Sequence, residues 1–281
     1  MPSINHFQKR SLLIEQLNAE KKAGKTIGFV PTMGALHQGH LSLVEQAKKE
    51  CDIVVVSIYV NPLQFNNPND LKNYPRSLAN DFTLLSNHGN IIVFCPSFDD
   101  VFPNGEEQYA LNVGEIANLL EGHYRPGHFT GVIKVVNALF DLIKPNKAYF
   151  GNKDYQQVLI VKKMVQILGQ DVKIIACPTH RSKNGLAMSS RNALLSEQEG
   201  REAALIYEAL KLCKEKINSL SPADLKAEAS SLFENGPLKL EYLEIVSADE
   251  LVPINNWEQK SICCIAAYCG KVRLIDNLML N

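Results

Sequence analysis

The chain has no long apolar segment and almost no net charge over its 281 residues. No apolar run approaches the about 20 residues that a membrane-spanning helix needs, so a helical membrane protein is excluded and no membrane partner is expected. A formal net charge of −1 provides no basic surface for nucleic acid or for an anionic membrane. The first residues lack the apolar core of a signal peptide, and we therefore expect a cytoplasmic protein.

Cysteine is too irregular for a disulfide framework, because seven cysteines are an odd number and show no regular spacing. Such usage suits a reducing compartment. Cys263, Cys264 and Cys269 cluster and could bind a metal, but their apolar neighbours favour a buried strand in which cysteine is a small hydrophobic side chain. The chain also lacks internal repeats and low-complexity segments, and its length suffices for two globular domains.

In the first two thirds of the chain, short apolar runs alternate with amphipathic stretches. The runs typical of strands fall at residues 26–30, 53–60, 91–95, 148–150 and 172–176, and the helical patterns at 40–50, 77–88, 130–143 and 155–168. This alternation predicts an α/β domain with a Rossmann-like, doubly wound parallel sheet over residues 1–178. Loops at the carboxyl ends of such strands are where these sheets bind ligands.

From residue 179 the pattern changes, and we predict a second, smaller α+β domain over residues 179–281. A long helix at 196–218 and a shorter one at 223–234 precede strands at 238–246 and 261–268, and a final strand or tail follows at 271–275. The strands predict an antiparallel sheet.

The most informative stretch of the chain is GFVPTMGALHQGH, from Gly28 to His40. A strand-like run passes through a Pro/Gly turn into the start of a helix, whose free N–H groups attract phosphate. His37 and His40 are three residues apart and share one face of the first helical turn. Gly39 has no side chain, so a flat ring such as adenine could lie against the backbone.

This His-x-Gly-His pattern resembles the signature of the nucleotidylyl transferase superfamily, whose members transfer AMP or CMP from a nucleoside triphosphate. Two other interpretations remain open for His37 and His40. They could face solvent, or they could be zinc ligands, although the following helix offers only Glu45 as a third ligand.

Two later clusters follow the same logic. In FGNKDYQQ, at residues 150–157, Lys153 is a cation where a phosphate could bind, and Asp154 could cap a helix or bind ribose hydroxyls. Alone, this cluster fits a capped surface turn. In NGLAMSSRN, at residues 184–192, hydroxyls, backbone N–H groups and Arg191 suit the terminal phosphates of ATP. The latter resembles the Lys-Met-Ser-Lys-Ser loop of the superfamily, with Ala187 in place of its first lysine.

Six motifs together resemble those of the pantoate–β-alanine ligase (pantothenate synthetase) family. They lie at residues 31–40, 61–65, 74–76, 125–132, 151–157 and 185–192. The resemblance is dense between about residues 25 and 195 and looser beyond. It implies ATP-dependent ligation of (R)-pantoate to β-alanine through a pantoyl adenylate, with release of AMP and pyrophosphate, in pantothenate and coenzyme A biosynthesis. It also implies ATP as a substrate accompanied by Mg²⁺, and a homodimer.

The resemblance assigns roles to individual residues. His40, as the acid, and His37 and Lys153 are implied as catalytic, and Gln64 and Gln157 as the residues that hold pantoate, with Gln64 also near β-alanine. Neutral amides suit a carboxylate that must remain nucleophilic. The implied ATP-binding residues are Met33, Gly34, Ala35, Leu36, His37, Gln38, Gly39, His40, Gly151, Asn152, Lys153, Asp154, His180, Met188, Ser189, Ser190 and Arg191.

The chain departs from the family pattern at three positions. Asn152 stands where the family commonly has Glu, and Asn80 where it has an acid before Asp81, and the family has a small apolar residue near His180. Two rival functions are another adenylyl or cytidylyl transferase, which would need no glutamine pair, and a nucleotide-sensing protein without turnover. The neutral charge disfavours a tRNA ligase.

Overall fold

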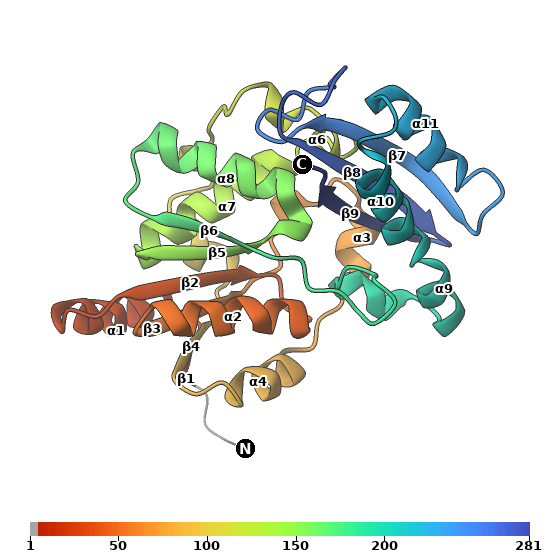
Figure 1. Ribbon diagram of the computed structural model, residues 1–281. Coiled ribbons are helices and arrows are strands. Elements are labelled where there is room, and N and C mark those ends of the chain that lie inside the picture. The colour runs from red at the N-terminus through yellow and green to blue at the C-terminus, as the bar shows by residue number, and fades with distance from the viewer. Residues whose placement is uncertain (1–4) are drawn as a thin grey trace. The chain divides into compact units, whose positions relative to one another are not determined.

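The computed structural model describes residues 5–281 and divides them into two compact units (Figure 1). The first unit contains residues 5–151 together with Gln156–Pro178. The second contains Asn152–Tyr155 and Thr179–Asn281. The chain therefore leaves the first unit briefly after residue 151, returns for one helix, and leaves again at residue 178.

The first unit is built on a parallel sheet of six strands in the order β1-β4-β3-β2-β5-β6. The strands are β1 (Asn5–Phe7), β2 (Ile27–Thr32), β3 (Ile53–Ile58), β4 (Ile91–Phe94), β5 (Lys147–Gly151) and β6 (Lys173–Cys177). On one side of β2 the chain continues into β3 and β4, and on the other it resumes with β5 and β6. The strand order thus reverses between β2 and β5, which is where open α/β sheets bind their ligands.

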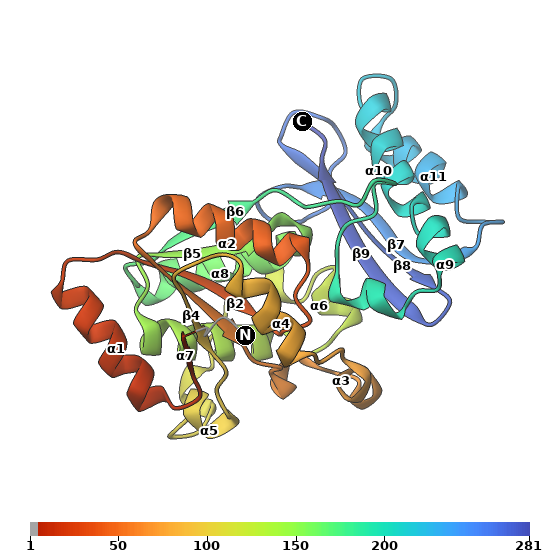
Figure 2. The ribbon, with the colours of Figure 1, turned by 90° about the horizontal axis from the view of Figure 1, so that it is seen from below.

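Helices cover both faces of this sheet (Figure 2). Successive side chains of β2 point to opposite faces. Val30 packs in a core that includes Val44 of α2 and Leu85 of α4, whereas the Phe29 ring meets Phe140 of α7 on the other face, with ring centroids 6.2 Å apart. The helices are α1 (Arg10–Lys22), α2 (Gln38–Glu50), α3 (Pro68–Asn73), α4 (Leu78–Ser86), α5 (Phe98–Val101), α6 (Glu121–Tyr124), α7 (His128–Ile143) and α8 (Tyr155–Leu168). The predicted doubly wound sheet is confirmed.

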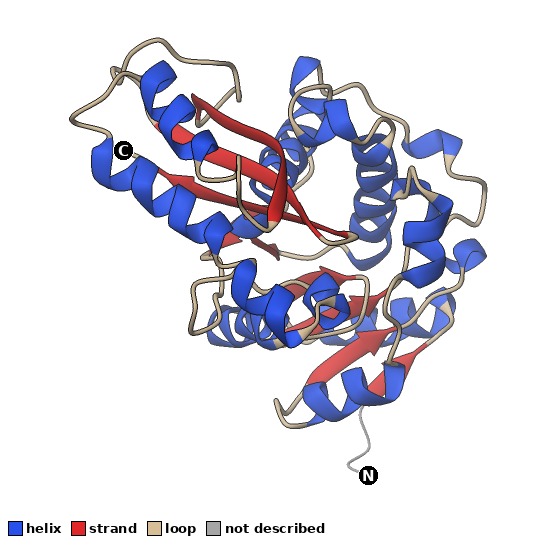
Figure 3. Ribbon diagram, turned by 90° about the vertical axis from the view of Figure 1, so that its right-hand side faces the viewer, coloured by secondary structure: helices blue, strands red, loops and turns tan. Residues whose placement is uncertain are grey.

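The second unit has a three-stranded antiparallel sheet in the order β7-β8-β9, against which α10 and α11 pack (Figure 3). Its elements are α9 (Glu197–Glu202), α10 (Leu205–Lys216), α11 (Pro222–Ser231), β7 (Leu238–Ser247), β8 (Ser261–Cys269) and β9 (Val272–Met279). Cys263, Cys264 and Cys269 lie buried on β8, which confirms their interpretation as small hydrophobic side chains. The predicted α+β character of this part is also confirmed.

The structure differs from the sequence prediction in several elements. The strand β1 and the helix α1 were not predicted, because α1 buries only Leu13 and Leu17 and its apolar stripe is correspondingly weak. The single helix predicted over 196–218 is two helices, α9 and α10, interrupted at Ala203 and Ala204.

Within residues 5–281, no helix is both long and apolar enough to cross a membrane.

Candidate active site

The two histidines of the first motif cap the N-terminus of α2. The Nδ1 atom of His37 accepts a hydrogen bond from Gly39 N at 3.1 Å. The Nδ1 atom of His40 accepts one from His37 N at 3.3 Å. These bonds form a reciprocal capping box, and the two rings lie with centroids 4.1 Å apart. The predicted common face of His37 and His40 is therefore present.

The capping box also determines where the imidazole protons lie. A backbone N–H can only donate, so each Nδ1 must present its lone pair. In a neutral imidazole the proton is then on Nε2. His37 and His40 therefore each hold an Nε2–H donor on the first turn of α2, where the helix dipole also favours an anion. This geometry suits hydrogen bonds to a phosphate.

The loop between β2 and α2 is held by a buried carboxylate from α4. Asp81, which is 1% exposed, accepts from Leu36 N at 2.7 Å and from Ala35 N at 3.1 Å. Ala35 has φ +48°, a conformation that L-residues rarely adopt without such support. Burial raises the pKa of the Asp81 carboxyl, although the two hydrogen bonds oppose that rise. Asp81 thus fixes the backbone immediately before the histidines.

Gln64 lies at the end of a short 3₁₀ helix, η1 (Pro62–Gln64), and is almost fully buried. Asn61 Nδ2 donates to Gln64 Oε1 at 3.2 Å, which sets the orientation of the amide. Gln64 Nε2 then donates to Met33 Sδ at 3.0 Å. Because a thioether is a weak acceptor, this N–H is readily available to a stronger one such as a carboxylate.

Two adjacent glutamines at the start of α8 behave differently. Gln156 is buried, and its Nε2 donates to Ile116 O at 2.8 Å and to Leu119 O at 2.7 Å. Its Oε1 accepts from Glu121 N at 3.0 Å. Gln157 is partly exposed, and its amide forms no hydrogen bond with any residue in the described part of the chain. Gln156 is therefore structural, whereas Gln157 is free to meet a ligand.

In the second unit, Lys153 and Asp154 lie on the 3₁₀ helix η4 (Asn152–Asp154). Lys153 Nζ is 3.4 Å from Asp154 Oδ1. The Asn277 side chain of β9 clamps the η4 backbone, with Nδ2 2.9 Å from Asn152 O and 2.8 Å from Lys153 O. The buried Asn152 Oδ1 has no hydrogen-bond partner among residues 5–281. Asn152 is thus the family departure that leaves a polar atom unsatisfied.

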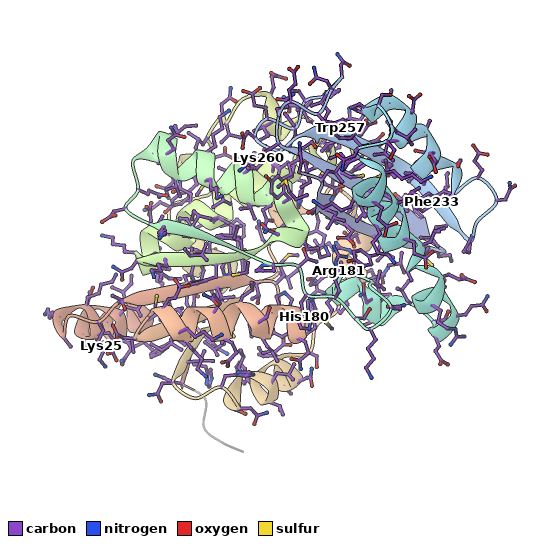
Figure 4. The ribbon with its side chains drawn as sticks, viewed as in Figure 1. Lys25, His180, Arg181, Phe233, Trp257 and Lys260 are labelled. Carbon is purple, nitrogen blue, oxygen red and sulfur yellow. The ribbon has the colours of Figure 1, made fainter. Side chains whose placement is uncertain are left out.

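The segment after β6 carries the last motif, and His180 and Arg181 mark its start (Figure 4). Met188 N donates to His180 O at 2.9 Å, which closes a tight loop. Ser189 then caps the 3₁₀ helix η5 (Ser190–Leu194) by accepting from Arg191 N at 3.3 Å. Ser189 is thus the N-cap of η5.

Arg181 anchors this loop to the body of the second unit. Its guanidinium forms a double ion pair with Asp276 of β9, one contact being 3.0 Å, and lies 4.1 Å above the Tyr207 ring. Burial raises the pKa of the Asp276 carboxyl, against the opposing effect of Arg181. Arg181 also borders a cavity of about 240 Å³ whose other lining residues are Asn152, Tyr155, Thr179, Ile262, Asn277, Leu278 and Met279.

Comparisons with known proteins agree with this geometry. The family model described as pantoate-beta-alanine ligase matches residues 5–279. The chain is 46% identical over 279 residues to a pantothenate synthetase of Fervidobacterium nodosum, with 96% of this chain and 99% of the relative covered. It is 45% identical over 285 residues to that of Cytophaga hutchinsonii, covering 100% and 99%.

Solved structures give the same result. Pantothenate synthetase from Thermus thermophilus superimposes with a TM-score of 0.92 at 39% identity, covering 99% of both chains. The chain belongs to the pantoate–β-alanine ligase family. The Francisella tularensis pantoate-β-alanine ligase, solved with a β-γ ATP compound and β-alanine, has a TM-score of 0.83 at 40% identity and covers 99% and 98%. The resemblance based on six short motifs is confirmed.

The predicted site residues of this family member fall into two groups. In the first unit, the loop from Met33 to His40 and Gln64 are joined by the Met33–Gln64 hydrogen bond, while Gly151 ends β5 and Gln157 lies in the first turn of α8. In the second unit, the groups are Asn152 to Asp154 and the loop with His180 and Met188 to Arg191. Sequence reasoning did not assign roles to Asn61 and Asp81, although Asn before Pro62 is a typical cap signal.

Proposed function

We propose that this chain joins pantoate to β-alanine at the expense of ATP, through an enzyme-bound pantoyl adenylate. One observation carries the proposal: the two Nε2–H donors of the α2 cap and the Gln64 amide are connected through the short loop that contains Met33. A phosphate site thus adjoins an amide suited to a carboxylate. Adenylation of a carboxylic acid needs those two sites side by side.

In the first step, a carboxylate oxygen of pantoate attacks the α-phosphorus of ATP. The bond from that phosphorus to the oxygen bridging to the β-phosphate breaks, and pyrophosphate leaves. His37 and His40 donate through Nε2 to phosphate oxygens as negative charge grows on them, with His40 as the acid, and Lys153 neutralises the α-phosphate. Donors held in place by the capping box need no reorganisation when that charge appears.

In the second step, the amine of β-alanine attacks the carbonyl carbon of pantoyl adenylate. The bond from that carbon to the phosphate oxygen breaks, AMP leaves, and the new amide nitrogen loses a proton. Gln64 and Gln157 hold pantoate by hydrogen bonds throughout, and Gln64 also contacts β-alanine. Both are neutral donors, so the pantoate carboxylate retains the charge that makes it a nucleophile in the first step.

The remaining predicted residues are proposed to bind the nucleotide. The adenosine is faced by two segments, the backbone from Met33 to Leu36 with Gln38 and Gly39, and Gly151 with Asn152 and Asp154. His180 packs near the adenine. Met188, Ser189, Ser190 and Arg191 hold the β- and γ-phosphates. The C-terminal domain, residues 179–281, would close over the ATP bound to residues 1–178.

Magnesium is proposed to arrive with ATP as part of the substrate. Both oxygens of Asp81 already accept backbone hydrogen bonds. Within residues 5–281 no three His, Cys, Asp or Glu side chains are grouped to hold a metal. These observations favour coordination by the ATP phosphates rather than by a resident protein site. Titration of activity with Mg²⁺ at fixed ATP checks this proposal.

We further propose a cytoplasmic homodimer that binds neither nucleic acid nor membranes. The use of ATP and seven free cysteines suit a reducing compartment. The homodimer follows the family resemblance, and light scattering after gel filtration tests it.

The deciding experiment measures release of AMP and pyrophosphate in the presence of ATP with pantoate, with β-alanine, and with both. We expect stoichiometric AMP, pyrophosphate and pantothenate only when both acids are present. Release of pyrophosphate with an unrelated nucleotide acceptor instead would favour another nucleotidylyl transferase. ATP binding without product under all three conditions would favour a nucleotide sensor.

A further inference from the structure

A buried histidine outside the predicted site holds the backbone of Gln64. His128 begins α7 and is 8% exposed. Its Nδ1 lies 2.8 Å from Gln64 O. A carbonyl oxygen only accepts, so the His128 proton must be on Nδ1. Its Nε2 then presents a lone pair, and the Arg125 guanidinium donates to it at 3.2 Å. Both ring nitrogens of His128 are therefore committed to fixed partners.

The polar contacts continue from His128 to the start of α8. Arg125 NH1 lies 3.6 Å from the Glu121 carboxylate, whose side chain is 8% exposed. The backbone N–H of Glu121 donates to Gln156 Oε1 at 3.0 Å. Gln156 directly precedes Gln157. A continuous chain of hydrogen bonds and one ion pair, buried except at the partly buried Arg125, thus links the backbone of Gln64 to the helical turn that presents Gln157.

The same turn of α7 is in close contact with the η1 backbone. A Cβ built at Gly131 would lie 2.2 Å from Leu63 O and 2.5 Å from Gln64 N, so a larger residue there would displace η1. Asn61 Nδ2 donates to Gly131 O at 3.0 Å as well as to Gln64 Oε1. The Gln64 amide is therefore held through its side chain by Asn61, and its backbone is held by His128.

We propose that His128 is a positioning residue for the pantoate site, and that with Gln156 it sets the relation between the Gln64 and Gln157 amides. This inference rests on the proposed function, in which those two amides hold pantoate. His128 itself touches no substrate, since both ring nitrogens are engaged by protein groups. The His128 hydrogen bond prevents the Gln64 backbone from moving when Gln64 Nε2 gives up its hydrogen bond to Met33 Sδ and donates to the substrate instead.

The test compares His128→Leu in the wild-type and in a Gln64→Ala background. In the wild-type background, loss of one hydrogen bond to the Gln64 backbone should raise the KM for pantoate about tenfold. The KM for ATP should stay within about twofold. In the Gln64→Ala background the Gln64 amide that His128 positions is absent, so the same substitution should change the KM for pantoate by less than about twofold. A merely structural role would act equally in both backgrounds.

Two further variants separate positioning from general loss of stability. His128→Asn keeps a side-chain N–H close to the place of Nδ1 and should restore most of the pantoate affinity. Asn137→Leu removes a buried hydrogen bond from the same helix α7, where Asn137 Oδ1 accepts from Gln170 Nε2 at 2.8 Å. That control should leave the KM for pantoate unchanged. If His128→Leu does not fold, His128→Gln, whose donor is displaced by one carbon, replaces it.

The outcomes are distinguishable. Two results would overturn the positioning role and leave the proposed function intact. One is an equal rise of the pantoate KM on His128→Leu in both backgrounds. The other is no rise on His128→Leu in either background, while Gln64→Ala does raise the pantoate KM. If Gln64→Ala itself does not change the KM for pantoate, the assignment of Gln64 to pantoate in the proposed function is wrong.

Discussion

Asp81 and Leu36 are 45 residues apart in the sequence, yet Asp81 Oδ1 accepts the Leu36 backbone N–H at 2.7 Å. The second oxygen accepts from Ala35 N. A single carboxylate therefore satisfies two donors of a loop that would otherwise be strained at Ala35. The position of His37, one residue later, depends on this contact.

Asp81→Asn should lower the free energy of unfolding by about 1–3 kcal/mol, because its NH₂ group faces one of two backbone N–H donors that both need an acceptor. The pKa of the Asp81 carboxyl is raised from its ordinary 3.8 by burial. Folded protein then binds this proton more tightly than the unfolded chain. The stabilisation from Asp81 is greatest below pH 3.8 and falls as the pH rises through the native pKa.

Urea unfolding at about pH 4.5 and about pH 7.5 checks this sign, and the deficit of Asp81→Asn relative to the wild type should shrink at the higher pH. Asp52→Asn is a matched control, whose deficit should be the same at both pH values. Hydrogen bonds from Thr26 lower the pKa of Asp52, so its stabilisation is present above pH 3.8 and lost as the pH falls. A deficit for Asp81→Asn that grows with pH would contradict the burial argument.

His40→Ala should reduce kcat about a hundred- to a thousandfold, because it removes a donor to charge that develops in the transition state. The KM for ATP should change little. This variant also loses half of the capping box, so His40→Asn is needed beside it. The Asn Oδ1 can still accept from His37 N, but the side chain has no donor in the place of Nε2. Both variants should lose turnover, and only His40→Ala should lose stability. Near-normal turnover by either would show that His40 is a cap alone.

Gln157→Ala should raise the KM for pantoate and leave that for ATP nearly unchanged, with a loss of about 1.5–3 kcal/mol for a hydrogen bond to a charged group. Steady-state kinetics with each substrate varied in turn measures both constants. The neighbouring Gln156→Ala is the contrasting variant. It removes three hydrogen bonds to backbone groups, so its main expected effect is a loss of stability. A defect selective for ATP would place Gln157 in the nucleotide site instead.

The sequence predicts the sheet and the strand–turn–helix around His37 and His40 well because both depend on short-range patterns. An apolar strand such as β3 is recognised from its own run of side chains. The residues flanking His37 are recognised as a turn followed by a helix cap. The supports of the site loops could not be predicted in the same way. Asp81 and His128 contact backbone groups 45 and 64 residues away in the chain, and which loop each would meet is decided by the packing of α4 and α7. The family resemblance singled out Gln157, but only the structure shows how it differs physically from the adjacent Gln156, which is buried and bonded to backbone groups.

The last prediction concerns the two half-reactions. Arg191, on η5 behind the Ser189 cap, is proposed to hold the phosphates that leave as pyrophosphate in the first step. An acyl adenylate reacts with water, so the site should stay closed until β-alanine arrives. Pantoate and ATP alone should therefore support isotope exchange between pyrophosphate and ATP with little free AMP. Arg191→Ala should depress that exchange yet spare the reaction of β-alanine with supplied pantoyl adenylate, in which no pyrophosphate takes part. Equal damage to both half-reactions would instead assign Arg191 to the fold of the second unit.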